Sequence, residues 1–170
     1  RAALKTMIGA SMLRVELPDD VVEELNQYID DEVIPADVSA SEKLVGQINS
    51  TDKSKQLVFD LNSEAGGSFK TVLDKLGKTF VSRGFGADVV ADTFEAWTVH
   101  SYAGDYNPYH DHGVKTMAGL SGFLWLKVPE CIEKLDAAIP EGINNANGAV
   151  DGFTHLIWGT NTRKDILQLK

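Results

Sequence analysis

Apolar residues recur at helical spacing near the start of the chain. After Pro18 and two aspartates, apolar side chains follow one another every third or fourth residue up to Val33. The aspartates favour a helix N-terminus, because the helix dipole stabilises negative charge there. The pattern predicts an amphipathic helix that begins after Pro18 and that Pro35 stops.

A second helical pattern begins at residue 68. Ser68 is typical of an N-cap, and apolar residues after it occupy one helix face up to Phe80. The glycines of Gly84-Phe85-Gly86 indicate where this helix ends. Between the two predicted helices, residues 43–48 and 55–61 fit either short strands or loop, because turn-forming residues bound both segments.

From residue 93 the hydrophobic period changes to that of a strand. Residues 93–102 alternate and are rich in aromatic and β-branched side chains. Further strands are predicted at 109–113, 120–128 and 152–158. We expect Gly122, in the middle of the strand that Pro129 ends, to allow close packing against a neighbouring element.

Helices followed by several short strands indicate the α+β class. The second half is predicted to be an antiparallel sandwich or barrel. With 170 residues, of which 43% are hydrophobic, the chain fits a single domain over residues 1–170. We expect a helical part up to about residue 90 and a β-rich core from about residue 91.

Charge and composition exclude several functional classes. The net charge of −9 disfavours binding to nucleic acid or to an anionic membrane, since phosphate recognition needs clustered Lys and Arg. No apolar run approaches the roughly 18 residues of a membrane span. The single cysteine, Cys131, excludes an internal disulfide and a cysteine-based zinc site. Residues 1–10 lack the apolar core of a signal peptide, so we expect a cytoplasmic location.

The strongest chemical signal is a His-x-His pair. His110 and His112 are two of only four histidines, and in an extended strand they project to one face while Asp111 projects to the other. Imidazole pairs of this kind bind iron, zinc, copper or nickel. His155, in the predicted strand at 152–158, is a further candidate ligand, although a hydrogen-bonded structural histidine fits it as well. His100 and the tryptophans are most simply pocket or core residues.

The residues around this pair resemble a known family. The segment from Trp97 to Gly113, followed by Leu120-Ser121-Gly122 and an apolar run to Pro129, is similar to the iron(II)/2-oxoglutarate-dependent oxygenases of marine phage and bacteria. These enzymes are related to prolyl 4-hydroxylases. Their pattern has a Trp, a Gly-Asp before the metal motif, a His-x-His or His-x-Asp pair, and a Leu-Ser-Gly strand that ends at Pro.

The resemblance implies a double-stranded β-helix, a jelly-roll or cupin-like core, with N-terminal helices packed on it. It implies Fe(II) held by His110 and His112, with 2-oxoglutarate as cosubstrate and Tyr102 as a cosubstrate contact. Molecular oxygen then oxidises 2-oxoglutarate to succinate and carbon dioxide, and its second oxygen atom hydroxylates a C–H bond of a peptidyl or small-molecule substrate. If the source is viral, the expected location is the host cytoplasm.

Two departures from the family pattern leave alternatives open. His112 stands where the commoner triad has a carboxylate, and no Gly-rich Phe-Pro segment precedes a distal histidine. We expect the third ligand and the 2-oxoglutarate-anchoring Arg beyond Lys170, with His155 and Arg163 as the candidates inside the chain. The alternatives are a non-catalytic jelly-roll binding module and a three-histidine metal dioxygenase that uses His155.

Overall fold

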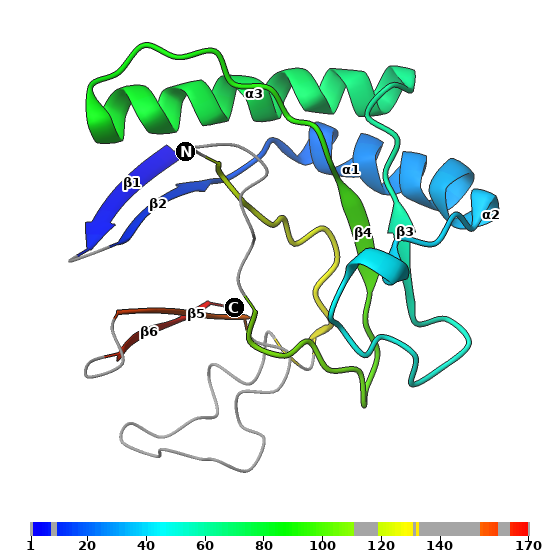
Figure 1. The fold of residues 1–170 in the computed structure, drawn as a ribbon. Helices are drawn as coiled ribbons and strands as arrows, with labels where there is room; N and C mark the ends of the chain where they lie inside the picture. The colour runs from blue at the N-terminus through cyan, green and yellow to red at the C-terminus, as the bar shows by residue number, and fades with distance from the viewer. Residues whose placement is uncertain are drawn as a thin grey trace. The chain divides into compact units, whose positions relative to one another are not determined.

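A computed structural model describes residues 2–7, 10–110, 119–130, 132, 154–159 and 164–169. Figure 1 shows the described helices and strands with their labels. The chain divides into two compact units. The first comprises Arg1–Leu4 with Leu13–Phe123, and the second comprises Lys5–Met12 with Leu124–Lys170. All the helices discussed below and the sheet that carries the candidate site belong to the first unit.

The first helical segment continues further than the sequence predicts. Helix α1 (Asp19–Tyr28) passes through a π-helical turn (Ile29–Val33) into α2 (Ile34–Ala36), and Asp37 ends it with a φ of 51°. The helix is confirmed, but the prediction that Pro35 stops it is wrong, because Pro35 lies inside the last turn. The widened turn that precedes it accommodates a ring that would clash with the carbonyl four residues back in a regular α-helix.

The apolar stripe of this segment forms one side of the core. Leu25, Ile29 and Val33 are buried, as the periodicity predicts. Tyr28 is buried beside them, and its ring meets Phe59 edge-on with 5.3 Å between centroids. Burying each aliphatic side chain of this kind contributes about 1.5–3 kcal/mol.

Helix α3 (Glu64–Phe85) begins one turn before the predicted start. Ser63, not Ser68, is the N-cap, and its Oγ accepts a hydrogen bond from the Gly66 N–H at 3.0 Å. Position 66 lies inside the helix and requires a glycine, because a Cβ there would come within 1.9 Å of the Asp60 carbonyl oxygen. The predicted exit is confirmed, since Gly86 caps the helix with a φ of 68°.

Strands β3 (Lys55–Val58) and β4 (Trp97–His100) pair antiparallel. Residues 55–58 are therefore strand, one of the two alternatives that the sequence left open. Leu57, which is 2% exposed, pairs with Thr98 and faces the core, whereas Val58 and Trp97 pair on the opposite sheet face. The segment around Ser39 continues the sheet through an isolated antiparallel bridge to Leu57.

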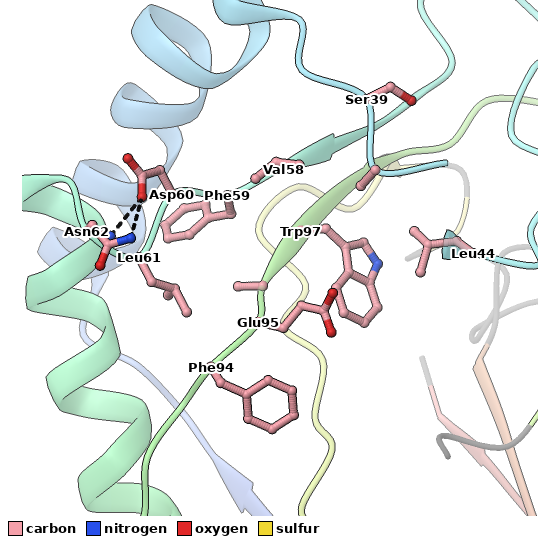
Figure 2. Close-up of a pocket in the computed structure, with 12 residues that line it drawn as sticks. Ser39, Leu44, Val58, Phe59, Asp60, Leu61, Asn62, Phe94, Glu95 and Trp97 are labelled. Carbon is pink, nitrogen blue, oxygen red and sulfur yellow. Dashed lines mark hydrogen bonds between the residues drawn. The ribbon is translucent and has the colours of Figure 1, made fainter. Parts of the chain in front are cut away.

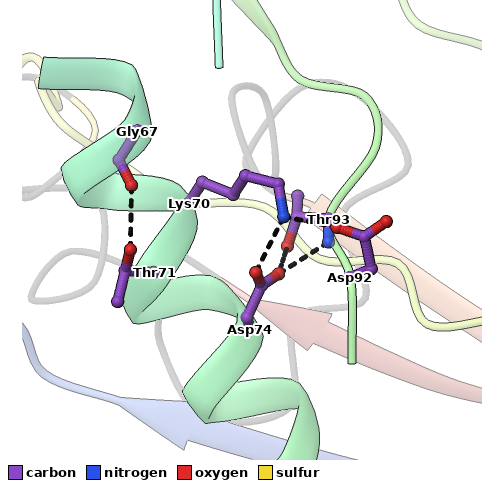
Figure 3. A network of polar contacts seen from close by, with 6 residues as sticks. All are labelled: Gly67, Lys70, Thr71, Asp74, Asp92 and Thr93. Carbon is purple, nitrogen blue, oxygen red and sulfur yellow. Dashed lines mark hydrogen bonds and ion pairs between the residues drawn. The ribbon is translucent and has the colours of Figure 1, made fainter. Parts of the chain in front are cut away.

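Strand β4 is shorter than predicted, because the residues before it are bonded to α3 instead (Figure 3). The Asp74 carboxylate accepts hydrogen bonds from the Thr93 N–H and hydroxyl, each at 2.6 Å. Lys70 forms ion pairs with Asp74 and with Asp92. Burial raises the pKa of Asp74, but the hydrogen bonds from Lys70 and Thr93 outweigh it, so the pKa is lowered.

The strand predicted at 120–128 is not formed. Residues 119–129 carry no strand pairing, and a Cβ added at Gly122 would meet no atom of the described residues within 4 Å. Leu120 lies against α3 instead, with its Cδ1 3.5 Å from the position a Cβ would take at Gly77. The expectation that Gly122 allows close packing is therefore wrong for the described part of the chain.

In the second unit, β5 (Thr154–Gly159) pairs antiparallel with β6 (Lys164–Leu169). This confirms the predicted strand at 152–158 over the residues that are described. Strands β1 (Ala2–Met7) and β2 (Ala10–Val15) form another two-stranded sheet that the sequence did not indicate.

The jelly-roll core and the single-domain organisation remain predictions. Across the described segments, no helix has both the length and the apolar character needed to cross a membrane.

Candidate functional site

The turn that leads into the His-x-His motif is held by one carboxylate. Asp105 Oδ1 accepts hydrogen bonds from the backbone N–H groups of Asn49 and Ser50, both at 2.8 Å. Its Oδ2 accepts a third from the Tyr102 N–H at 2.7 Å. One side chain therefore satisfies two donors of a single segment, which lie 56 and 55 residues before it in sequence, and one donor of its own turn.

The backbone next to Asp105 strengthens this connection. Gln47 and Tyr106 exchange two backbone hydrogen bonds, of 2.7 and 3.1 Å, in an isolated antiparallel bridge. Gly104 adopts a φ of 96°, which a side chain would disfavour, and a Cβ there would come 3.2 Å from the Ser50 Cβ. Residues 102–106 are thus hydrogen-bonded to residues 47–50. The fixed turn ends at Tyr106, four residues before His110.

The environment of Asp105 favours its ionised form. Burial raises the pKa of this carboxyl, but hydrogen bonds from the backbone of Tyr102 and Ser50 and from the Ser54 and Ser50 hydroxyls hold it well below the ordinary range. A depressed folded-state pKa contributes stability above the unfolded pKa of about 3.9, and that contribution is lost as the pH falls through the folded value. The turn is therefore sensitive to acid.

We expect Asp105→Asn to lower the urea midpoint at pH 7, because a carboxamide must turn its NH₂ donor toward one of the N–H groups that the carboxylate accepts. The difference from wild type should shrink below about pH 4, where wild-type Asp105 begins to lose its own contribution. Urea titrations at pH 7 and pH 3 measure this. Asp52→Asn, an exposed carboxylate in the adjacent loop, is the control and should track wild type. If the urea midpoints of Asp105→Asn and wild type differed by the same amount at both pH values, the ionised Asp105 carboxylate would not be the stabilising group.

His110 has its ring orientation set locally. Its Nδ1 lies 2.7 Å from the Pro108 carbonyl oxygen, which can only accept a hydrogen bond, so Nδ1 carries the proton. In the neutral imidazole the lone pair is then on Nε2. A backbone carbonyl bonded to one ring nitrogen is the usual support of a metal-ligating histidine, because it fixes the tautomer and the ring plane.

Of the other predicted site residues, some lie within the described part of the chain and some do not. His112 and Arg163 lie outside the described residues. The backbone of His155 belongs to β5 in the second unit, opposite Gln168. Tyr102 is 46% exposed, and its N–H is bonded to Asp105. His100 Nε2 lies 3.1 Å from Thr98 Oγ1 in β4. Within the described ranges, no three His, Cys, Asp or Glu side chains gather into a metal-binding group.

The first unit also contains a pocket of about 280 Å³ that the sequence did not predict as a site (Figure 2). It lies on the sheet face of Val58 and Trp97. Trp97, expected to be core or pocket wall, lines it. Its other lining residues come from the segments at 39–44, 59–62 and 94–96. The signal that was available in sequence is the aromatic and acidic run Phe94-Glu95-Ala96-Trp97.

Comparison with known proteins finds no protein-family model, no curated protein and no solved structure that matches this chain. The functional argument therefore depends on the residues themselves.

Proposed function

We propose that the chain is an iron(II)/2-oxoglutarate-dependent oxygenase that hydroxylates a C–H bond of a peptidyl or small-molecule substrate. In this proposal His110 and His112 are two of the metal ligands. The observation that carries it is the hydrogen bond from His110 Nδ1 to the Pro108 carbonyl, which leaves Nε2 as the coordinating nitrogen. The sequence motif from Trp97 to Gly113 supplies the reaction class.

The imidazole of His110 is a suitable ligand for iron. A neutral imidazole is an accepted Fe(II) ligand, and a fixed tautomer lowers the cost of ordering it. Bound iron(II) would activate molecular oxygen, the oxidant, with 2-oxoglutarate as the two-electron reductant, and so supply an oxidising power that no amino-acid side chain has. The chain contributes position: the Asp105 hydrogen bonds and the Gln47–Tyr106 bridge fix the backbone that enters the motif, and Pro108 orients the ring.

Tyr102 has a place in the same proposal. Its backbone N–H is tied to Asp105, and its side chain is half exposed, so its hydroxyl is available at the surface of the turn. We assign it a contact to 2-oxoglutarate, as the resemblance implies.

Tyr102→Phe should raise the KM for 2-oxoglutarate more than it lowers kcat, because only a cosubstrate hydrogen bond is removed.

The test is succinate formation by the purified protein, expressed from its complete reading frame and supplied with Fe(II), 2-oxoglutarate and oxygen. We expect turnover, even when uncoupled from a substrate, that requires Fe(II) and disappears in His110→Ala. His100→Gln is the matched control, since that histidine is held by Thr98 within β4. Bound metal without succinate would contradict the oxygenase, and a loss of that metal in His155→Ala would then indicate the three-histidine reading.

A further inference from the structure

The pocket beside Trp97 occupies one face of the β3–β4 sheet. Val58 and Trp97 are cross-strand partners there, and Val58 is 42% exposed although it is apolar and lies in the sheet. Leu44 and Phe94 belong to the apolar part of the lining, together with Ala40, Phe59, Leu61 and Ala96, and Phe94 is 64% exposed. A pocket of about 280 Å³ is just below the range for small-molecule sites, roughly 300–1,000 Å³, and suits one long side chain.

The polar part of this pocket is acidic. Glu95 lies two residues before Trp97, and Figure 2 shows its carboxylate turned toward the indole ring. Asp60 adds a second carboxylate to the lining, with Oδ1 accepting a hydrogen bond from the Asn62 N–H. The twelve lining residues include no Lys or Arg, and the whole chain carries a net charge of −9.

We propose that this pocket binds the cationic side chain of a lysine or arginine in a basic peptide. The aliphatic stem lies along Leu44 and Val58, and the charged head meets the Glu95 carboxylate at the face of Trp97. Aromatic faces attract cations and carboxylates accept charge-assisted hydrogen bonds, so the two features select the same ligand chemistry. Long cationic side chains also bury their stems against apolar surface.

Other ligand classes fit less well. A wholly apolar ligand would displace water from the Glu95 carboxylate and return no charge-assisted hydrogen bond to it. An anionic ligand at the face of Trp97 would meet the Glu95 carboxylate and no Lys or Arg of the pocket lining. The proposal goes beyond the oxygenase function and does not depend on it, because neither metal nor 2-oxoglutarate takes part in the binding.

The experiment is a titration of the metal-free, full-length chain, followed through the indole N–H signal of Trp97 in nitrogen–proton correlation spectra. Trp97→Phe assigns that signal. The probes are the blocked tripeptides acetyl-Gly-X-Gly-amide, with lysine, arginine, norleucine or glutamate as X. We expect saturable shifts with lysine and arginine, none with glutamate, and at least tenfold weaker binding with norleucine. Binding should also weaken between 0.05 and 0.5 M salt, as the Debye length shortens.

Glu95→Gln keeps the side-chain size and removes the charge, and should weaken lysine-peptide binding about tenfold. Glu24→Gln, an exposed carboxylate on α1, is the matched control and should bind as wild type does. Equal binding of the lysine and norleucine peptides, no binding of either, or unchanged binding by Glu95→Gln would each overturn the proposal. Butylamine that binds as tightly as the lysine peptide would overturn the assignment to a peptide.

Discussion

His110→Ala is expected to weaken binding of Fe(II), or of Co(II) as its spectroscopic substitute, by more than about a hundredfold. Loss of a supporting group around a metal ligand already costs about 10–100-fold in affinity, and loss of the ligand itself should cost more. The free energy of unfolding without metal should hardly change, because His110 is exposed and its Nδ1 hydrogen bond goes to a carbonyl only two residues away. Equilibrium dialysis and the Co(II) absorption bands give the affinity, and urea unfolding gives the stability.

The control for this substitution is His100→Gln, which removes an imidazole from β4 and should leave metal affinity within about twofold of wild type. His112→Ala should match His110→Ala if both are ligands. Near-wild-type occupancy in His110→Ala would remove the metal site on which the oxygenase proposal depends. A loss of metal that accompanies unfolding would show that the effect is structural.

Gly66→Ala is expected to destabilise the first unit by about 1–3 kcal/mol, as overpacking of a tight site does. A Cβ at this position would lie 1.9 Å from the Asp60 carbonyl oxygen and 2.8 Å from its carbonyl carbon. Backbone atoms cannot rotate away as the end of a flexible side chain can, so either the 60–63 turn or the start of α3 must shift. The Ser63 cap, whose Oγ bonds to the Gly66 N–H, should weaken with it.

Gly67→Ala provides the matched control, one residue further along the same helix. Its Cβ would lie 3.6 Å from the Leu61 carbonyl oxygen, which is an ordinary contact. The variant should be neutral or up to about 1 kcal/mol more stable, because alanine is the better helix former. Urea unfolding, followed by far-UV circular dichroism, compares the two. Equal stability of both variants would contradict the close approach at Gly66.

Features that depend on neighbouring residues could be read from sequence. The buried stripe of α1 follows from apolar residues at a 3.6-residue period, and the Gly86 cap follows from the left-handed conformation that glycine tolerates. The chemistry of His110 belongs to this group as well. Its ring is hydrogen-bonded to the carbonyl of Pro108, only two residues away in sequence.

Features that depend on distant residues were decided by tertiary contacts. Ser63 rather than Ser68 caps α3, and its Oγ also lies 2.8 Å from the hydroxyl of Tyr28, 35 residues earlier, a contact that the local sequence does not reveal. Leu120 has a strand-like neighbourhood in sequence, yet it lies against Gly77 of α3. Apolar burial is non-directional, so the same residues can satisfy it in a strand or against a helix.

The same division holds for the candidate site. Sequence alone predicts which residues could bind a metal and on which segment they lie, since spacing and side-chain type are local properties. Only the tertiary structure decided how that segment is held, because Asp105 accepts hydrogen bonds from residues 55 and 56 positions away. It also decided that Glu95 and Trp97 line a pocket with Val58, since cross-strand register brings together residues that no local pattern connects.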